Sequence, residues 1–295
     1  MLLTIYCVYA NMYDATIRYR EHSVRRVHSR YRLEKVVSND TSTMSTTRQA
    51  IAERLATRTW YQNTDQELQQ TLLNLPENWN GFLDDLAARP ETISNVTQLR
   101  LLNLLHANFG TLVVFEVKNA KGDVFTYEYH SWRHGPNSGS KGVVFVRTGD
   151  VITDFVVLRG EKFGPAKPCW DTTGGFAEAG FTLSEQYVNE IRQELGSSDI
   201  EVNEVHDLGN IMTDAGQTNN NPSTFVAIID AHNATKVERK PINPDVYELQ
   251  AGAFVFPISQ LPAHILENGD TFFLTAVLRS VAMGILPASA ITPQT

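Results

Sequence analysis

The sequence predicts a mixed α/β fold preceded by a helical region. Apolar residues recur at three- and four-residue steps from Met44 to about Phe109, and the pattern changes to that of β-strands at Gly110. Beyond Gly110 the predicted strands outnumber the helices, which interrupt them singly and at long intervals. This order indicates a mixed sheet covered by helices, and not a regular wound sheet of βαβ units. No G-x-G-x-x-G or G-x-x-x-x-G-K-[ST] motif follows a strand, which argues against a Rossmann or P-loop nucleotide site.

The composition restricts the class of protein. A chain of 295 residues with 42% apolar residues can build a substantial core. The net charge of −8 argues against general nucleic-acid binding, which depends on Lys and Arg, but leaves room for a nucleotide-sized ligand. Cys7 and Cys169 lie too far apart in sequence to suggest a disulfide framework or a zinc site, so a cytoplasmic location is expected. No apolar run reaches about 18 residues, and we expect no membrane segment.

Residues 1–43 differ from the rest of the chain, with seven Lys and Arg against four Asp and Glu. Two interpretations stay open: an organellar targeting segment, or a poorly ordered extension, which we favour. Met44 begins a stretch of ordinary globular composition and is an alternative start.

The region 44–109 is expected to be helical throughout. Thr47 can cap the helix RQAIAERLATRTWY, and Asp65 can cap QELQQTLLNL, which ends before Pro76. GFLDDLAARP and VTQLRLLNLLHANF complete the pattern. We interpret the region as a small helical cap packed on the main domain, with a lid or partner-binding module as the alternative.

The main domain is expected over residues 110–288, followed by a tail at 289–295. TLVVFEV and VFTYEYHSW are rich in β-branched and aromatic residues, and KNAKGD between them is typical of a turn. Four further strands are predicted in GVVFVRT, ITDFVVLRG, TFVAIID and AFVFPI, and a closing helix in FFLTAVLRSVAM.

The stretch GGFAEAGFTLSEQYVNEIRQELG, residues 174–196, contains the candidate metal-binding residues. Thr182 and Glu185 have capping-box spacing, and Gly196 is placed to end the helix near Leu195. Glu190 and Glu194 lie one turn apart at the edge of an apolar stripe formed by Leu183, Tyr187, Ile191 and Leu195. Two such carboxylates can share a hard cation such as Mg²⁺, and two solvated surface glutamates are the alternative.

This stretch resembles the Nudix box, G-x5-E-x7-R-E-U-x-E-E-x-G-U, in which U is a bulky apolar residue. The matching positions are Gly175, Glu190, Ile191, Glu194 and Gly196. The positions that depart from the pattern are Phe181 for the first glutamate, Asn189 for the arginine, Gln193 for one glutamate and Ser197 for the last apolar residue.

The surrounding strands resemble the ADP-ribose pyrophosphatase branch of the Nudix hydrolases over roughly residues 110–288. The resemblance implies a Nudix α/β/α sandwich with a mixed sheet. It also implies metal-dependent hydrolysis of the diphosphate linkage in a nucleoside diphosphate derivative, such as ADP-ribose or a nucleotide sugar. Because of the altered box positions, a catalytically weak or inactive nucleotide-binding or sensor module is the alternative.

The resemblance further implies roles for individual residues. Glu190 and Glu194 would ligate Mg²⁺ or Mn²⁺, with the Gly174 carbonyl as a further ligand and Gln193 as an uncharged one. Glu178 would bind metal through water or order the loop. Glu248 would act as the catalytic base, with Asp207, Asp214 and Asp245 as competitors. Asp214 and Gly216 would approach the substrate, with a polar surface turn as the equal alternative.

Three expectations concern ligand contacts and assembly. Arg159 and Lys162 follow a strand and are placed to meet phosphates, with a solvated strand end as the alternative. Trp170 and Phe176 could stack on a base, although core packing is the favoured role. The hairpin before the box resembles strands that pair subunits in this branch, so a homodimer is an open alternative.

Overall fold

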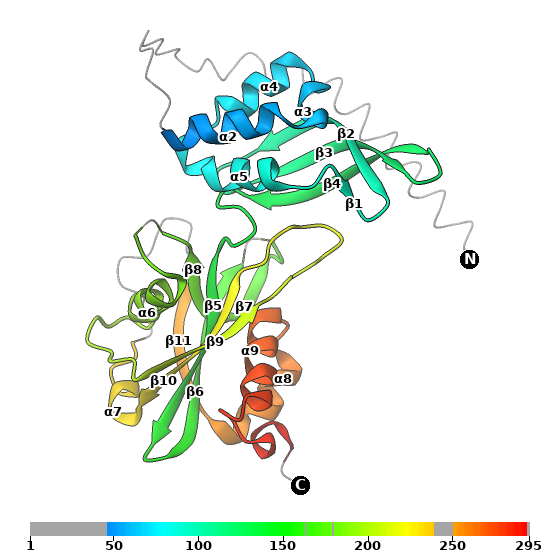
Figure 1. Cartoon of the computed structure of the whole chain (residues 1–295). Helices are drawn as coiled ribbons and strands as arrows, with labels where there is room; N and C mark the ends of the chain where they lie inside the picture. Colours follow the sequence, from blue (N-terminus) through cyan, green and yellow to red (C-terminus); the bar gives the residue numbers. More distant parts are fainter. Residues whose placement is uncertain (1–45, 163, 179, 239–249, 294–295) are drawn as a thin grey trace. The chain divides into compact units, whose positions relative to one another are not determined.

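The computed structural model describes residues 46–162, 164–178, 180–238 and 250–293, and within them the chain forms two separate β-sheets, each with its own helices (Figure 1). Glu248 and Asp245 lie outside the described residues. The described residues belong to one compact unit. None of the helices in the described ranges is long and apolar enough to span a membrane.

The helices expected early in the chain form over its first described part, with one correction. The run RQAIAERLATRTWY is not one helix capped by Thr47: Thr47 lies inside the first of two helices, Thr46–Ala56 and Thr59–Gln62, which are separated because Arg58 is extended (φ −81°, ψ 128°). Asp65 caps the next helix, accepting a 2.8 Å hydrogen bond from the backbone N–H of Glu67. The elements are α2 (Thr46–Ala56), α3 (Thr59–Gln62), α4 (Gln66–Leu73), the 3-10 turn η1 (Glu77–Trp79) and α5 (Asn80–Ala88).

These helices pack on a four-stranded antiparallel sheet. Trp60, Phe82 and Leu86 are fully buried against Val113 and Phe115 of that sheet. The strands, in the order β1-β2-β3-β4, are β1 (Thr92–Ile93), β2 (Val96–His106), β3 (Gly110–Asn119) and β4 (Val124–Trp132). The turn predicted between the last two strands is present, with the Asn119 side chain accepting from the backbone N–H groups of Lys121 and Asp123.

The prediction of a helix over VTQLRLLNLLHANF is wrong, because Val96–His106 is a strand. The pairing of β2 with β3 shifts register between Gln98 and Arg100 and again between Leu101 and Asn103. A bulge inserts one extra residue, so two bulges turn an alternating strand into one that buries every third residue. The buried positions are accordingly Gln98, Leu101 and Leu104. This spacing imitates the period of a helix.

The second sheet is mixed. Its main path is β11-β6-β5-β10-β9, with β7 paired to β6 and β8 paired to β5. Only β5 and β10 are described as a parallel pair, and the other pairs are antiparallel. The bounds are β5 (Gly139–Thr148), β6 (Val151–Lys162), β7 (Lys167–Asp171), β8 (Thr173–Phe176), β9 (Glu204–Asn210), β10 (Ser223–Asp230) and β11 (Gln250–Pro257).

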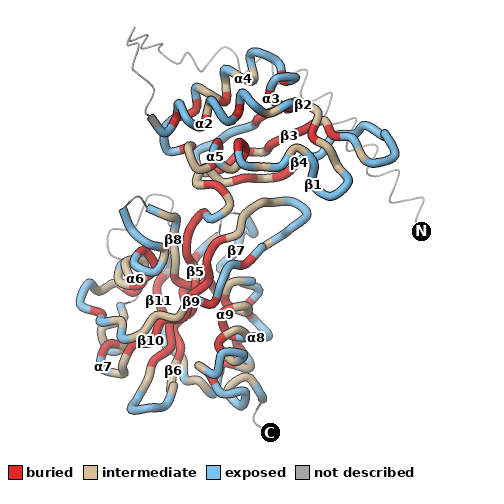
Figure 2. The backbone as a smooth tube through the Cα atoms, in the orientation of Figure 1, coloured by how far each residue is buried: buried red, intermediate tan, exposed pale blue. Residues whose placement is uncertain are grey.

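Helices cover both faces of this second sheet, as the red core in Figure 2 illustrates. Alternate residues of β5 point to opposite faces: Val144 packs toward Tyr187 and Ile191 of one helix, and Phe145 toward Phe273 of another. Burial on both faces explains the continuous apolar runs in β5 and β10. The helical elements are α6 (Leu183–Glu194), α7 (Ala231–Ala234), the turn η2 (Ile258–Gln260), α8 (Leu261–Glu267), α9 (Thr271–Ala282) and the turn η3 (Ala288–Ile291).

The boundary expected at residue 110 does not coincide with a change of sheet. Strands β3 and β4 pair with β2, and the second sheet begins at Gly139. The sequence of β3 and β4 is that of ordinary strands, and nothing local to it indicates which sheet they join.

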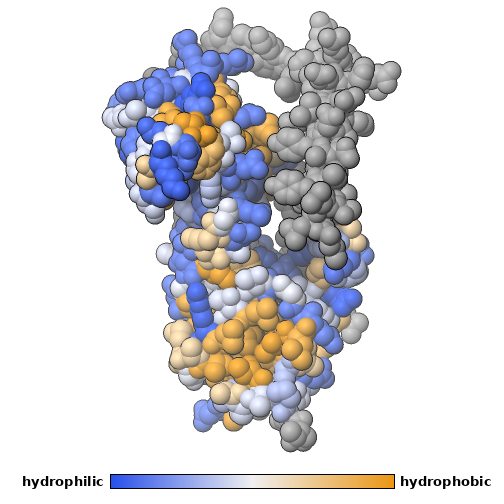
Figure 3. All heavy atoms as spheres, turned by 90° about the vertical axis from the view of Figure 1, so that its right-hand side faces the viewer, coloured by the Kyte–Doolittle hydropathy of each residue, from blue (hydrophilic) through white to orange (hydrophobic). Residues whose placement is uncertain are grey.

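The surface over α8 and α9 carries a group of hydrophobic side chains (Figure 3). Leu266, Leu278 and Met283 are respectively 85%, 60% and 55% exposed. These residues lie away from the faces of α8 and α9 that pack on the sheet, which bury Leu261, Phe273 and Val277.

Candidate functional site

Helix α6 has the start and end that the sequence predicts. The Thr182 hydroxyl accepts from the backbone N–H of Glu185, and the Glu185 carboxylate accepts from that of Thr182 at 2.8 Å. Gly196 follows the helix with a φ of 81°, a left-handed conformation that favours glycine. Tyr187, Ile191 and Leu195 are fully buried on the sheet. The cap and the apolar stripe therefore fix the orientation of α6.

We expect Thr182→Ala to lower the free energy of unfolding by about 1 kcal/mol, the typical contribution of an N-cap hydroxyl. The substitution leaves the backbone N–H of Glu185 without its side-chain acceptor. Ser184→Ala, at an exposed position two residues later, is the matched control and should change stability by less than about 0.5 kcal/mol. Urea denaturation of the three proteins measures the difference, and equal losses in both variants would contradict the role of the cap.

The two glutamates of α6 are held by neighbouring groups. Glu194 is 7% exposed and accepts a 2.8 Å hydrogen bond from the backbone N–H of Gly174. Gly174 has a φ of 144°, which favours glycine. Glu190 is half-buried and accepts a 2.8 Å hydrogen bond from Nε2 of Gln186. Gly175 lies so close to Glu190 that a Cβ atom there would be 2.0 Å from Oε1 of the carboxylate.

The charges around Glu194 are strongly coupled. Burial raises the pKa of Glu194 well above its ordinary value; Lys141 and the Gly174 N–H oppose this rise, and Glu190 and Asp171 add to it. A second carboxylate therefore makes the ionised form of this buried acid costly unless a cation is near.

Lys141 of β5 supplies such a cation. Its ammonium donates a 2.8 Å hydrogen bond to Asp171, which also pairs with Lys162. Burial would lower the pKa of Lys141, but Asp171, Asp270 and Glu194 hold it above its ordinary value. Burial would likewise raise the pKa of Asp171, but the two lysines hold it well below its usual range. The pairing of Lys141 with Asp171 therefore favours the charged form of both groups.

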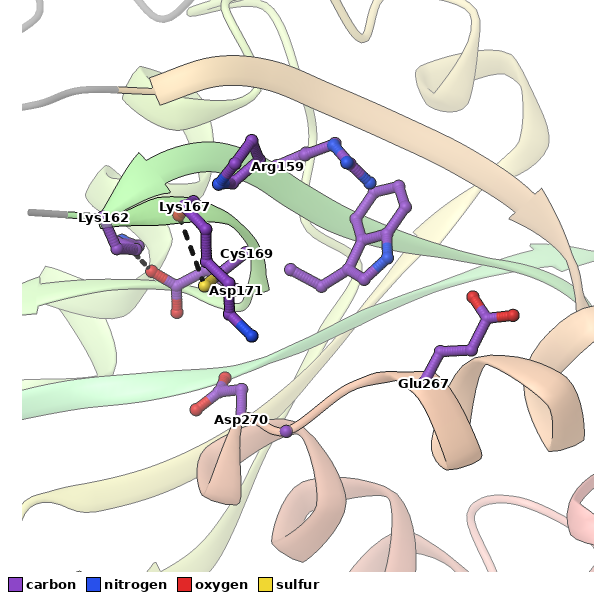
Figure 4. A pocket seen from close by; sticks show the side chains of 10 residues that line it. Arg159, Lys162, Lys167, Cys169, Asp171, Glu267 and Asp270 are labelled. Atoms are coloured by element: carbon purple, nitrogen blue, oxygen red, sulfur yellow. Dashed lines mark hydrogen bonds and ion pairs between the residues drawn. The ribbon is translucent and has the colours of Figure 1, made fainter. Parts of the chain in front are cut away.

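A pocket of about 580 Å³ adjoins this cluster through Asp171 (Figure 4). Three cationic residues of β6 and β7, Arg159, Lys162 and Lys167, line it opposite the acids Glu267 and Asp270. The Arg159 guanidinium lies 4.8 Å above the ring centre of Trp170. The remaining lining residues are Pro168, Cys169, Trp170, Asp171 and Gly269. We call this the cationic pocket.

The residues around α6 are compatible with a divalent cation. Oε1 of Gln186 is buried and has no hydrogen-bond partner among the described residues, while its Nε2 contacts Glu190. Amide and carboxylate oxygens are the hard ligands that Mg²⁺ and Mn²⁺ accept. The described residues contain no group of three or more His, Cys, Asp or Glu that could hold a metal. Any further ligands would therefore come from amide or carbonyl oxygens, water or substrate.

The structure brings some of the predicted site residues together and separates others. Glu190, Glu194, Gly174 and Gly175 are adjacent, and Arg159 lines the cationic pocket. Gln193 and Glu178 are exposed. The Asp214 carboxylate accepts from the backbone N–H of Gly216 and so closes a local turn; Gly216 lines a different pocket, beside the first sheet.

Both aromatic residues near the box pack against protein. Trp170 lies against Phe254, Phe256 and His264, with ring centres 4.8 to 5.8 Å apart, and the Arg159 guanidinium also contacts its ring. Phe176 stacks on Phe109 at 5.7 Å. The favoured expectation of core packing is therefore confirmed for Trp170, whereas Phe176, 37% exposed, joins a surface aromatic cluster.

Sequence reasoning missed four residues of the cluster: Lys141, Asp171, Gln186 and Asp270. Gln186 lies one turn before Glu190 and was within reach of the helical spacing. Asp171 lies four residues before Gly175, at the end of β7, where helical spacing does not apply. Lys141 and Asp270 come from β5 and from the residue that caps α9, and no local pattern connects them.

Comparison with known proteins supports the fold. No family model matches the chain, and no curated protein matches it. Among solved structures, the crystal structure of an ADP compounds hydrolase matches with a TM-score of 0.51 and 13% sequence identity, covering 69% of this chain and 100% of that chain. At this identity the match shows that part of the chain shares the mixed α/β fold of that hydrolase.

Proposed function

We propose that this protein is a divalent-metal-dependent hydrolase of the Nudix type that cleaves the diphosphate linkage of a nucleoside diphosphate derivative, with ADP-ribose or a nucleotide sugar as substrate. The observation that carries the proposal is the placement of Glu190 and Glu194 on α6, packed against Gly175 and Gly174. Lys141 links them to the cationic pocket, because it interacts with Glu194 and is bonded to Asp171, which lines that pocket. The fold shared with an ADP compounds hydrolase supports it.

Glu190, Glu194 and Oε1 of Gln186 would hold Mg²⁺ or Mn²⁺. The metal, when bound, would neutralise charge on the diphosphate and lower the pKa of an attacking water. Lys141 keeps a positive charge beside Glu194 and limits the repulsion between the carboxylates. Gln193 contributes no charge to the set, so we expect fewer metals bound, or weaker binding, than with a glutamate there.

Arg159, Lys162 and Lys167 would bind the diphosphate oxygens. Lys162 is half-buried and paired with Asp171, so its ammonium is held in one place, whereas Lys167 is exposed. The guanidinium of Arg159 covers the Trp170 ring, and this contact restricts the orientation of its donors. A planar guanidinium held over a ring can donate hydrogen bonds to two oxygens of one phosphate.

The test is turnover by the full chain on ADP-ribose, NADH, nucleotide sugars and dinucleoside polyphosphates, with Mg²⁺ and then Mn²⁺. We expect Glu190→Gln to lower turnover at least about a hundredfold, because the metal contributes several kcal/mol and each 1.4 kcal/mol is a factor of ten. Glu201→Gln, which removes an exposed acid of the same region, should retain activity.

Full activity in folded Glu190→Gln would refute this assignment of the site. If folded wild-type protein binds a nucleotide of the panel saturably but releases no product with either metal, the protein is instead a nucleotide-binding module.

A further inference from the structure

A second cluster of buried polar atoms is formed by residues that precede and follow the stretch 174–196 in the sequence. Tyr129 of β4 is 5% exposed, and its hydroxyl has no hydrogen-bond partner among the described residues. Nε of Arg89 and Oδ1 of Asn219 are likewise buried and unpartnered there. Leaving one such group unpaired costs about 1–3 kcal/mol, so three in one place require an explanation.

All three residues line one pocket of about 570 Å³, which we call the aromatic pocket. It shares no lining residue with the cationic pocket. Its other walls are mostly apolar or aromatic and come from the first sheet and the β9–β10 segment: Ile93, Val96, Phe115, Val117, Phe125, Tyr127, Met212, Ala215 and Gly216. Its volume is in the range of small-molecule sites, which combine apolar walls with a few convergent polar groups.

The wall contributed by the β9–β10 segment is anchored to the first sheet. The backbone N–H of His130 donates to the Gln217 carbonyl at 2.7 Å, and that of Asn219 donates to the His130 carbonyl at 3.3 Å. Nδ2 of Asn219 also donates to the Asp85 carboxylate at 2.8 Å. Because a carboxylate only accepts, this bond fixes the orientation of the amide and leaves Oδ1 as an acceptor for another group.

The charge in the aromatic pocket is already balanced. Arg89 pairs with Asp85 at 3.7 Å and lies 4.5 Å above the Tyr129 ring centre. Burial raises the pKa of Asp85, while Arg89 and the Asn219 bond oppose that rise. Arg89 is the one cationic residue among those that line the aromatic pocket, and it is already paired, whereas Arg159, Lys162 and Lys167 line the cationic pocket. Its unpartnered groups are one acceptor (Asn219), one donor (Arg89) and a hydroxyl that can do either.

We propose that the aromatic pocket binds an uncharged heteroaromatic ring that carries a hydrogen-bond donor and an acceptor on one edge, the chemistry of a nucleobase in a nucleoside. The aromatic walls would contact the faces of the ring, and Asn219, Arg89 and Tyr129 would meet its polar edge. The ligand occupies a site separate from the diphosphate site, so the inference does not depend on the proposed hydrolysis.

The experiment is titration of the full chain with adenosine, guanosine, cytidine and uridine, followed by saturation-transfer NMR and calorimetry. At least one nucleoside should bind saturably in the millimolar range or below. Tyr129→Phe should weaken that binding roughly fivefold to tenfold, the effect of one hydrogen bond. Its melting temperature should not fall, because the hydroxyl removed has no partner in the protein.

Tyr187→Phe is the matched control, because the Tyr187 hydroxyl is bonded to Thr173 at 3.1 Å. It should lower the melting temperature and leave the nucleoside affinity unchanged. Glu190→Gln should also leave that affinity unchanged, which separates this site from the proposed active site. Absence of saturable binding by all four nucleosides would overturn the proposal. So would equal affinity in Tyr129→Phe, or a lower melting temperature of that variant.

Discussion

Gly175→Ala should reduce turnover about a hundredfold and leave the fold intact. The added Cβ would lie 2.0 Å from Oε1 and 2.4 Å from Cδ of Glu190, so the carboxylate must move. Displacing a catalytic group by about 1 Å can cost two orders of magnitude in rate. The displaced atoms are the end of a flexible side chain, and a changed rotamer costs only about 0.5–1.5 kcal/mol, so stability should fall by no more than that.

Gly164→Ala is the control for this substitution, since a Cβ at Gly164 would meet nothing within 4 Å. Turnover with the substrate found in the panel and urea denaturation of both variants give the two readouts. If Gly175→Ala were fully active, the contact between Gly175 and Glu190 would have no part in the reaction, and the proposed site would lose its main geometric support.

Lys141→Met, unlike Gly175→Ala, should cause a large loss of stability. It leaves the buried carboxylate of Asp171 with Lys162 alone and removes the cation nearest to Glu194 and Asp270. Removing one partner of a buried ion pair costs about 3–5 kcal/mol. Because 28% of the Lys141 side chain is exposed, we expect a value near the lower limit, about 3 kcal/mol.

The loss of stability in Lys141→Met should increase as the pH rises. The pKa of Asp171 is held below its unfolded value, so its contribution to stability is present above an unfolded pKa of about 4 and is lost as the pH falls. The pKa of Glu194 is raised by burial, and removing Lys141 would raise it further, which costs stability as the pH rises. Both effects make the gap between wild type and Lys141→Met large at pH 7–8. The Glu194 effect narrows the gap as the pH falls toward 4, and the Asp171 effect narrows it only below about pH 4.

Urea denaturation at several pH values measures this gap. Lys167→Met, which removes an exposed lysine of the cationic pocket, should change stability by less than about 0.5 kcal/mol at every pH. A destabilisation of Lys141→Met that is the same at pH 7.5 and pH 4.5 would show that its cause is lost packing and not lost charge.

The strands of the second sheet illustrate how much could be read from local pattern. GVVFVRT, ITDFVVLRG and TFVAIID are apolar runs bounded by polar residues, and all three form strands buried on both faces. The short strands β7, β8 and β9 went unpredicted, because four to seven residues of mixed polarity carry no clear period.

The sequence by itself determined helix α6. The Thr182 and Glu185 cap, the stripe through Tyr187 and Ile191, and the end at Gly196 all follow from contacts within about four residues along the chain, and such contacts repeat with the period of a helix. The spacing of Glu190 and Glu194 is fixed by the same geometry.

Only the tertiary structure decided which charges surround that helix and which sheet each strand joins. Lys141 and Asp171 lie 30 residues apart, Asn219 and Asp85 lie 134 apart, and β2 is a strand because two bulges match it to β3. These arrangements depend on which distant segments pair and on the burial that follows. Neither hydrophobic period nor residue spacing along the chain contains that information.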